Sequence, residues 1–182
     1  MFRLAPSILT AIIDQQDNIV PKDASSTRST ILTAAVQTLQ RGGIEGFTLE
    51  AVARRAGVVK GLILYHYASR ARLLRAAASQ VATARAIALE RALSGASGAE
   101  GLDACWEELR RQAQDGTARA WLSLCAAGLI DRSDRNREFE DAARESILDG
   151  ATTALASGVP LADARDAYDA LWLALLEVTA KD

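Results

Sequence analysis

Apolar residues recur every three or four positions along most of the chain, which is the spacing that places them on one face of an α-helix. The first such run predicts a helix capped by a hydroxyl residue, at Ser25, Ser26 or Thr27. The glycine pair Gly42-Gly43 ends this helix. Its buried face is expected to consist of Ile31, Leu32, Ala35, Val36 and Leu39.

Two short helices are predicted next. Thr48 is suited to cap the first of them, and Glu50 lies in its first turn, where the helix dipole favours a negative charge. Gly57 ends this helix, and the second follows from about Val59 to Tyr67. The first of the two is expected to bury Leu49, Val52, Ala53 and Ala56.

The remaining sequence predicts a long helix from Arg70 to about Leu93, a flexible joint over residues 94–101, and four more helices. The helix expected over residues 118–130 is apolar on nearly every side, so it should lie centrally. The other three patterns lie at residues 102–109, 134–157 and 162–180. Because strand alternation and internal repeats are absent, the sequence predicts an all-α fold.

The two short helices have the layout of a helix-turn-helix. This motif needs a small residue where the helices cross, a glycine at the bend and a branched apolar residue in the second helix. Ala53, Gly57 and Ile63 stand at these positions. Residues 59–66 then form a recognition helix able to enter the major groove of DNA. Its outward or edge positions are Lys60, Gly61, Leu62, Tyr65 and His66.

Charge is unevenly divided along the chain. Residues 24–85 hold nine basic and two acidic residues, whereas residues 86–182 hold ten basic and eighteen acidic residues. A basic segment of this kind is typical of a surface that faces a polyanion. A solvated basic face without a partner would give the same count, so the motif carries the argument for DNA.

The segment ILTAAVQTLQRGGIEGFTLEAVARRAGVVKGLILYHYASRARLL resembles the DNA-binding region of the tetracycline-repressor (TetR) family of transcriptional regulators. The similarity extends over about residues 27–85 and lies in the spacing of the first helix, Gly42, Thr48, Ala53, Gly57, Lys60-Gly61, the Tyr/His cluster and Ser69-Arg70. It implies an N-terminal three-helix bundle that contains the helix-turn-helix, followed by a C-terminal helical domain for ligand binding and dimerisation. The expected division is an arm at 1–24, the DNA-binding domain at 25–85 and the second domain at 86–182.

The resemblance also implies which residues meet the DNA. They are Arg28, Thr48, Val59, Lys60, Gly61, Leu62, Tyr65, His66 and Arg70. Arg28 and Thr48 would contact phosphates, and Arg70 would begin the helix that links the two domains. At Val59, Leu62 and Leu64 the chain departs from the hydroxyl-bearing residues common in the family. We therefore expect more of the base reading to come from apolar contacts, for example with thymine methyl groups.

A TetR-like protein usually holds an apolar cavity in its second domain, and the resemblance implies a small-molecule effector there. Trp106, Trp121 and Cys125 are the candidates for its wall, although Trp and Cys at helical spacing are also typical of a core. The last helix is apolar on more than one face, which indicates a homodimer. Leu175, on a stripe with Tyr168 and Leu171, is the residue expected at the dimer interface.

Catalytic and metal-binding functions find little support in the sequence. The single histidine, His66, has no Ser, Cys or Asp at a spacing that indicates catalysis, and a structural Tyr-His-Tyr cluster is the stronger alternative. Neither glycine-rich segment has the spacing of a phosphate-binding loop. Cys105 and Cys125 lack metal-ligand spacing, and buried thiols are favoured over a redox pair. We therefore expect no enzyme activity, metal or cofactor.

The chain lacks an apolar run long enough for a membrane span and lacks the features of a secretory leader, so a cytoplasmic protein with no membrane partner is expected. The sequence thus predicts a ligand-responsive regulator, a repressor, that binds palindromic operator DNA as a homodimer. One alternative is a DNA-binding protein of the same fold that has lost its ligand response. The other is a helical small-molecule-binding protein or enzyme with a vestigial DNA-binding domain.

Overall fold

The computed structural model describes residues 22–94, 99–130 and 139–179. Within these ranges the chain forms eight α-helices and no strand, which confirms the all-α prediction. The helices are α2 (Lys22–Gly42), α3 (Leu49–Ala56), α4 (Lys60–Tyr67), α5 (Arg70–Ser94), α6 (Ala99–Asp115), α7 (Thr117–Ala126), α8 (Phe139–Ala156) and α9 (Leu161–Thr179). Nearly all of the predicted arm, and residues 95–98 of the predicted joint, lie outside the described residues. The rest of the joint predicted over 94–101 is helical, with Ser94 in α5 and residues 99–101 in α6, so that prediction was too long.

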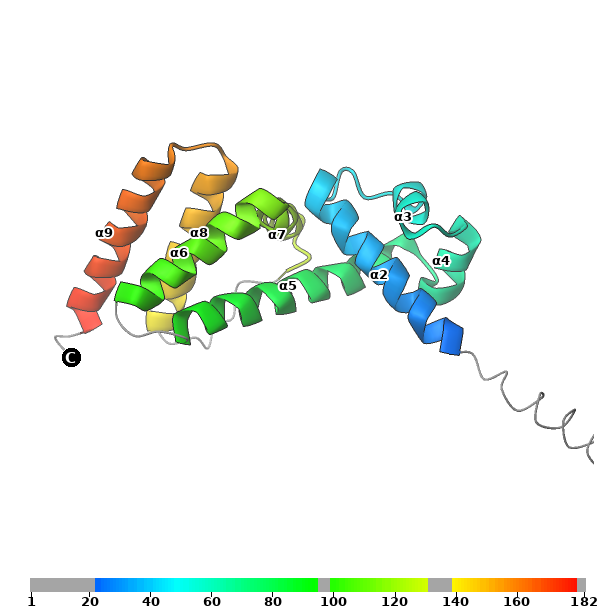
Figure 1. Cartoon of the computed structure of the whole chain (residues 1–182), viewed down its shortest axis with the longest axis horizontal. Coiled ribbons are helices and arrows are strands. Elements are labelled where there is room, and N and C mark those ends of the chain that lie inside the picture. Colours follow the sequence, from blue (N-terminus) through cyan, green and yellow to red (C-terminus); the bar gives the residue numbers. More distant parts are fainter. Residues whose placement is uncertain (1–21, 95–98, 131–138, 180–182) are drawn as a thin grey trace, which may run out of the picture.

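Helices α2, α3 and α4 pack with the first half of α5 into an N-terminal bundle (Figure 1). The predicted apolar face of α2 points inward, with Ile31, Ala35 and Leu39 buried. Its centre also includes Phe47, which precedes α3, and Ile63 of α4. This part of the fold follows the apolar pattern of the sequence closely.

Helix α5 belongs to two hydrophobic cores. Leu73, Ala77 and Val81 lie in the N-terminal core, whereas Leu89, two turns further on, lies in the core of the C-terminal helices. Figure 1 shows α5 extending from beneath α2 to beneath α6 and α8. One continuous helix therefore connects the two cores directly.

Helix α7 provides a second connection between the two parts. Ala120 and Leu124 of α7 are buried in the N-terminal core, so α7 is central, as its apolar character predicted. The turn before it lies against the end of α2: a Cβ atom at Gly116, whose φ is +85°, would overlap the carbonyl oxygen of Gln40. The Gln40 amide also donates to the Thr117 hydroxyl at 3.0 Å. Glycine is therefore required at this corner both by its backbone conformation and by the close approach.

The C-terminal core is built around aromatic side chains. Tyr168 of α9 is buried, and its ring centroid lies 5.2 Å from that of Trp106 on α6. Its hydroxyl donates to the carbonyl of Leu102 at 3.1 Å, which satisfies the one polar group of the side chain. Burial is the main cause that raises the pKa of Tyr168 above its ordinary value.

Two predictions about helix ends were wrong. Ser25, Ser26 and Thr27 lie inside α2, not at its N-cap, and the Ser26 carbonyl accepts hydrogen bonds from the hydroxyls of Ser29 and Thr30. Several hydroxyl residues in a row resemble a cap, but here the helix continues through them. Helix α7 ends at Ala126, four residues earlier than expected.

The prediction for the last helix was also wrong in one respect. Leu175 is only 8% exposed and packs in the C-terminal core with Tyr168 and Trp172. Leu171, expected on the same stripe as Leu175, is 50% exposed. Tyr168, Trp172 and Leu175 form the stripe that faces the core, which buries the large indole and leaves Leu171 outside.

Candidate functional site

The first helix of the helix-turn-helix, α3, has both of the caps that the sequence predicted. The Thr48 side chain accepts a hydrogen bond from the backbone N–H of Ala51 at 3.0 Å, which satisfies one of the free donors of α3. Gly57 adopts a left-handed conformation, with φ of 68°, and ends α3. The Val58 N–H donates to the Ala53 carbonyl at 3.0 Å, so the turn into α4 is fixed by main-chain bonds.

Helix α4 buries one face and exposes the other. Ile63 and Tyr67 are buried against the bundle. Val59 and Tyr65 are 74% and 80% exposed, values that are high for large apolar or aromatic side chains. Nothing lies within 4 Å of a Cβ atom built at Gly61, so the backbone of the first turn is open. This face can lie against a large, flat or grooved partner.

Arg28 attaches the end of α4 to α2. Its guanidinium donates to the His66 carbonyl at 2.8 Å and lies 4.5 Å from the ring centroid of Tyr67. The Tyr67 hydroxyl donates in return to the Arg28 carbonyl at 2.9 Å. Burial raises the pKa of Tyr67, which keeps the phenol in its donating form. Arg28 is thus engaged within the protein in addition to the phosphate contact that the sequence predicted for it.

Arg70 plays a similar part at the start of α5. Its Nε donates to the carbonyl of Phe47 at 2.9 Å, and its guanidinium lies 5.6 Å from the Phe47 ring centroid. The contact holds the loop before α3 against the first turn of α5. The side chain is exposed, as a residue at a nucleic-acid surface must be.

Lys60, at the start of α4, forms an ion pair with Glu50 of α3, with Nζ and Oε1 separated by 2.5 Å. The hydrogen bond from Lys60 holds the pKa of Glu50 below its ordinary value. Both side chains are exposed, so this ion pair is weak and Lys60 can readily leave Glu50 for another anion. The exposed surface of α4 therefore carries a cation that is balanced within the motif.

The structure brings most of the predicted DNA-facing residues onto one surface. The residues on or beside the exposed face of α4 are Val59, Lys60, Gly61, Leu62, Tyr65 and His66. The Tyr65 and His66 rings are in edge contact, with centroids 5.2 Å apart. Thr48, Arg28 and Arg70 come from neighbouring segments and hold the motif together. The contacts of these nine residues with DNA stay a prediction.

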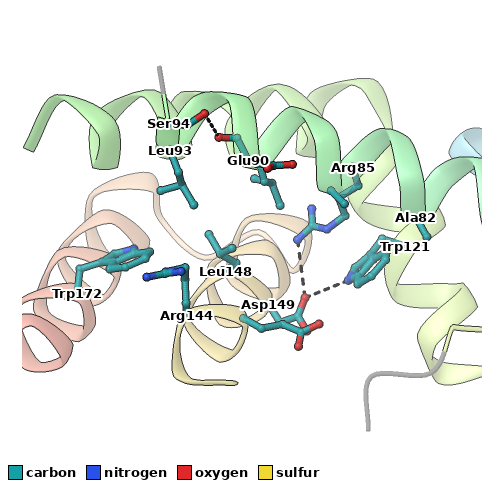
Figure 2. A pocket seen from close by; sticks show the side chains of 13 residues that line it. Ala82, Arg85, Glu90, Leu93, Ser94, Trp121, Arg144, Leu148, Asp149 and Trp172 are labelled. Atoms are coloured by element: carbon teal, nitrogen blue, oxygen red, sulfur yellow. Dashed lines mark hydrogen bonds and ion pairs between the residues drawn. The ribbon is translucent and has the colours of Figure 1, made fainter. Parts of the chain in front are cut away.

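A cavity of about 600 Å³ lies between α5, α7, α8 and α9 (Figure 2). Of the three candidates for a ligand-binding wall, Trp121 lines it, whereas Trp106 and Cys125 do not. Trp106 instead packs in the core against Tyr168. The cavity lining includes both large apolar and charged side chains. The apolar ones are Leu89, Leu93, Leu148, Trp121 and Trp172, and the charged ones are Arg85, Glu90, Arg144, Glu145 and Asp149.

Arg85 is the charged residue buried most deeply in this wall, at 4% exposure. Its guanidinium donates to the side-chain oxygen of Gln112 on α6 and to the Thr152 hydroxyl on α8, the latter at 2.8 Å. It also lies 4.9 Å from the ring centroid of Trp121. One side chain of α5 therefore contacts three helices of the C-terminal part.

Asp149 completes this cluster. Its carboxylate accepts a hydrogen bond from the Trp121 indole N–H at 3.0 Å and lies 3.7 Å from the Arg85 guanidinium. Burial lowers the pKa of Arg85, while the Asp149 carboxylate opposes this shift. The sequence analysis missed Arg85, Asp149 and Trp172, because residues so far apart along the chain give no local motif.

The described residues include no group of His, Cys, Asp or Glu side chains arranged to hold a metal ion. In the same part of the chain, no helix combines the length and apolarity needed to cross a membrane.

The N-terminal bundle is similar to a known protein family. Residues 31–77 match the family model described as bacterial regulatory proteins, tetR family. This match covers α3, α4 and parts of α2 and α5. Residues 31–77 therefore resemble the DNA-binding region of the TetR family of transcriptional regulators, as the sequence predicted. No curated protein sequence matches this chain.

Solved structures extend the similarity to the C-terminal helices. A TetR-like transcriptional regulator from Rhodococcus sp. RHA1 is 20% identical with a TM-score of 0.54, over 86% of this chain and 97% of that one. The multidrug binding protein EbrR, in complex with imidazole, is 24% identical with a TM-score of 0.53, over 79% and 87% of the two chains. The TetR-family protein CprB from S. coelicolor A3(2) is 26% identical with a TM-score of 0.50, over 85% and 88%. The all-α TetR fold therefore extends through both parts of the chain.

Proposed function

We propose that this chain is a TetR-family regulator, which binds palindromic operator DNA as a homodimer and represses transcription until a small molecule enters the cavity of its C-terminal part. The observation that carries the proposal is the exposed face of α4. Val59 and Tyr65 protrude from it, and it is held in place by Arg28 and by the turn at Gly57. A recognition helix needs such a face, because base edges are reached only by side chains that the protein leaves uncovered.

The apolar character of this face indicates how bases would be read. Val59 and Leu64 are exposed although neither side chain can form a hydrogen bond. Exposed aliphatic groups on a recognition helix fit the C5-methyl group of thymine. Lys60 supplies a cation for a phosphate or a guanine, once its ion pair with Glu50 opens.

The homodimer is supported by the outer face of α9. Leu171 is 50% exposed, and Ala167, Ala170 and Ala174 are exposed on the same side of the helix. A stripe of this kind, with one large residue among small ones, allows close packing of a second helix. Two-fold symmetry would use the stripe twice, and reading both half-sites requires the two copies of α4 to lie about 34–36 Å apart, one turn of DNA.

Response to a ligand is supported by the position of the cavity. Seven of its lining residues belong to α5, the helix that is packed in both cores. An effector controls DNA binding only by binding one arrangement of the domains more tightly than another. A molecule that displaces α5 would alter the separation of the two recognition helices. EbrR, described as a multidrug binding protein, has the same fold.

The test is to select bound fragments from the source genome with the purified full-length chain and to measure affinity for the selected sites by fluorescence anisotropy. Palindromic sites bound with nanomolar affinity, and with a steep dependence on salt, are the expected result. Binding that is weak and independent of sequence would contradict the proposal. It would instead favour a helical ligand-binding protein with a vestigial DNA-binding domain.

A further inference from the structure

The cavity has the size and lining of a site for a small, mostly apolar molecule. Its volume of about 600 Å³ falls in the range of sites for drug-sized ligands. Trp121 and Trp172 lie toward its two ends, and Leu93 and Leu148 extend into the space between them (Figure 2). Walls made of indole and aliphatic side chains suit an aromatic or polycyclic body.

The charges in the wall are balanced in pairs. Arg85, which is buried, and Asp149, which is partly buried, carry opposite charges 3.7 Å apart. Arg144 and Glu145, both half-buried, also carry opposite charges, while Glu90 is exposed to solvent. An ionic ligand would lose its hydration, and the four charged side chains of the wall that are not exposed, two of each sign, would offer it no excess of opposite charge. The lining therefore favours an uncharged molecule.

Hydrogen-bond donors are available at both ends of the cavity. The Arg85 guanidinium has five N–H groups, and its side-chain acceptors are Gln112 and Thr152, since Asp149 is beyond hydrogen-bond distance. At the other end, the Trp172 indole nitrogen is buried and has no acceptor in hydrogen-bond geometry among the described residues. Donors of this kind are matched by an oxygen acceptor on the ligand.

We propose that the cavity takes an uncharged aromatic or polycyclic molecule that carries a carbonyl oxygen, and that this oxygen binds the Arg85 guanidinium beside Asp149. The proposal rests on the proposed function, in which the same cavity receives the effector. The bound oxygen contacts the one α5 side chain that holds α6 and α8, so it acts where α5 is attached to the rest of the C-terminal part.

Four naphthalenes of similar size test the ligand class by equilibrium dialysis against the full-length protein. They are 2-acetylnaphthalene, 2-ethylnaphthalene, 2-naphthoate and 2-naphthyltrimethylammonium. The ketone should bind about fivefold more tightly than the ethyl compound, because only the ketone accepts a hydrogen bond. It should also bind at least about tenfold more tightly than either ion, because both ions lose hydration without gaining a counter-charge.

Two variants place the compounds in this cavity. Ala86→Trp adds an indole at a lining position of α5 that is exposed enough to accept one, and it should weaken all binding. Asp149→Asn keeps an acceptor for Trp121 but leaves Arg85 without its counter-charge. It should therefore raise the affinity for 2-naphthoate about tenfold. Glu107→Gln removes a carboxylate outside the cavity and is the matched control, with no change expected.

The outcomes separate this inference from the proposed function. The ligand class would be overturned if either ion bound the unaltered protein most tightly, or if the ketone did not bind up to its solubility limit. Neither result would affect the DNA binding of the same preparation, so the proposed function would still stand. Conversely, tight binding of the ketone with unchanged operator affinity would leave the ligand class standing and would contradict ligand control. If Asp149→Asn fails to fold, the comparison of the four compounds on the unaltered protein still decides the class.

Discussion

The guanidinium of Arg28 donates a hydrogen bond to the main-chain carbonyl of His66, so the last turn of the recognition helix is attached to α2. This carbonyl belongs to the end of a helix, where acceptors lack partners and the dipole is negative. The cation therefore supports the orientation of α4 before any DNA is present. A phosphate contact by Arg28 would add a second function to the same side chain.

Arg28→Ala should lower both stability and operator affinity. Loss of a charge-assisted hydrogen bond and of the contact with Tyr67 should reduce the free energy of unfolding by about 1 kcal/mol, measured by urea denaturation. Arg91→Ala removes an exposed arginine in the last turn of α5, far from α4, and serves as the control, with stability unchanged. Equal stability of the two variants would show that Arg28 does not hold α4.

Removal of Glu50 should increase DNA affinity. In Glu50→Gln the Lys60 ammonium no longer has a carboxylate partner, so it is available to a phosphate without first breaking an ion pair. We expect operator affinity to rise about two- to threefold at low salt, with the difference fading as salt screens the pair. Glu45→Gln, which removes an exposed carboxylate before α3, is the matched control for net charge.

Lys60→Ala should have the opposite effect and should flatten the plot of log affinity against log salt by about one unit. Arg70→Ala should weaken binding too, and it should also lower the melting temperature, because Arg70 holds the Phe47 carbonyl. Undiminished affinity and an unchanged slope in both variants would place the DNA-binding surface elsewhere.

Gly116→Ala should be far more damaging than Gly128→Ala. Both glycines have positive φ, so each alanine costs about 1–2 kcal/mol in backbone strain. Only at Gly116 would the added methyl group overlap the Gln40 carbonyl, whereas it meets nothing within 4 Å at Gly128. Thermal denaturation should separate the two by several degrees. Similar melting temperatures would mean that α7 does not press against α2 in solution.

Leu171→Asp should convert a dimer to monomers in sedimentation experiments while the fold is retained, because Leu171 is exposed in the single chain. Leu175→Ala should instead cost about 2–5 kcal/mol of stability, since Leu175 lies in the core. Affinity of Leu171→Asp for a full palindrome should fall toward that for a half-site. A Leu171→Asp protein that still dimerises would assign the interface to another surface.

The N-terminal bundle was largely predictable because its information is local. The motif could be recognised from residues close together in the sequence, namely Thr48, Gly57 and Ile63. The structure confirms all three placements. The orientation of α9 was not predictable in the same way. Leu171 and Trp172 are neighbours on the helix surface, and their relative burial depends on how large a side chain the other helices can enclose.

The cavity was predicted only through Trp121. Its other determinants are a salt bridge and hydrogen bonds between residues of four helices, and none of these has a sequence pattern. Trp106 and Trp172 both pack against Tyr168 in the C-terminal core, yet of the two only Trp172 also lines the cavity. Composition alone does not distinguish a core indole from a lining one.

The burial of Ala120 and Leu124 of α7 in the N-terminal core has a consequence for protein engineering. A DNA-binding fragment cut after residue 85 would lose these two side chains and expose the apolar surface that they cover. A chimaera that joins this recognition helix to a foreign sensor must therefore import α7 together with the bundle, or supply an equivalent helix against the end of α2. The modular unit in this chain is discontinuous in sequence.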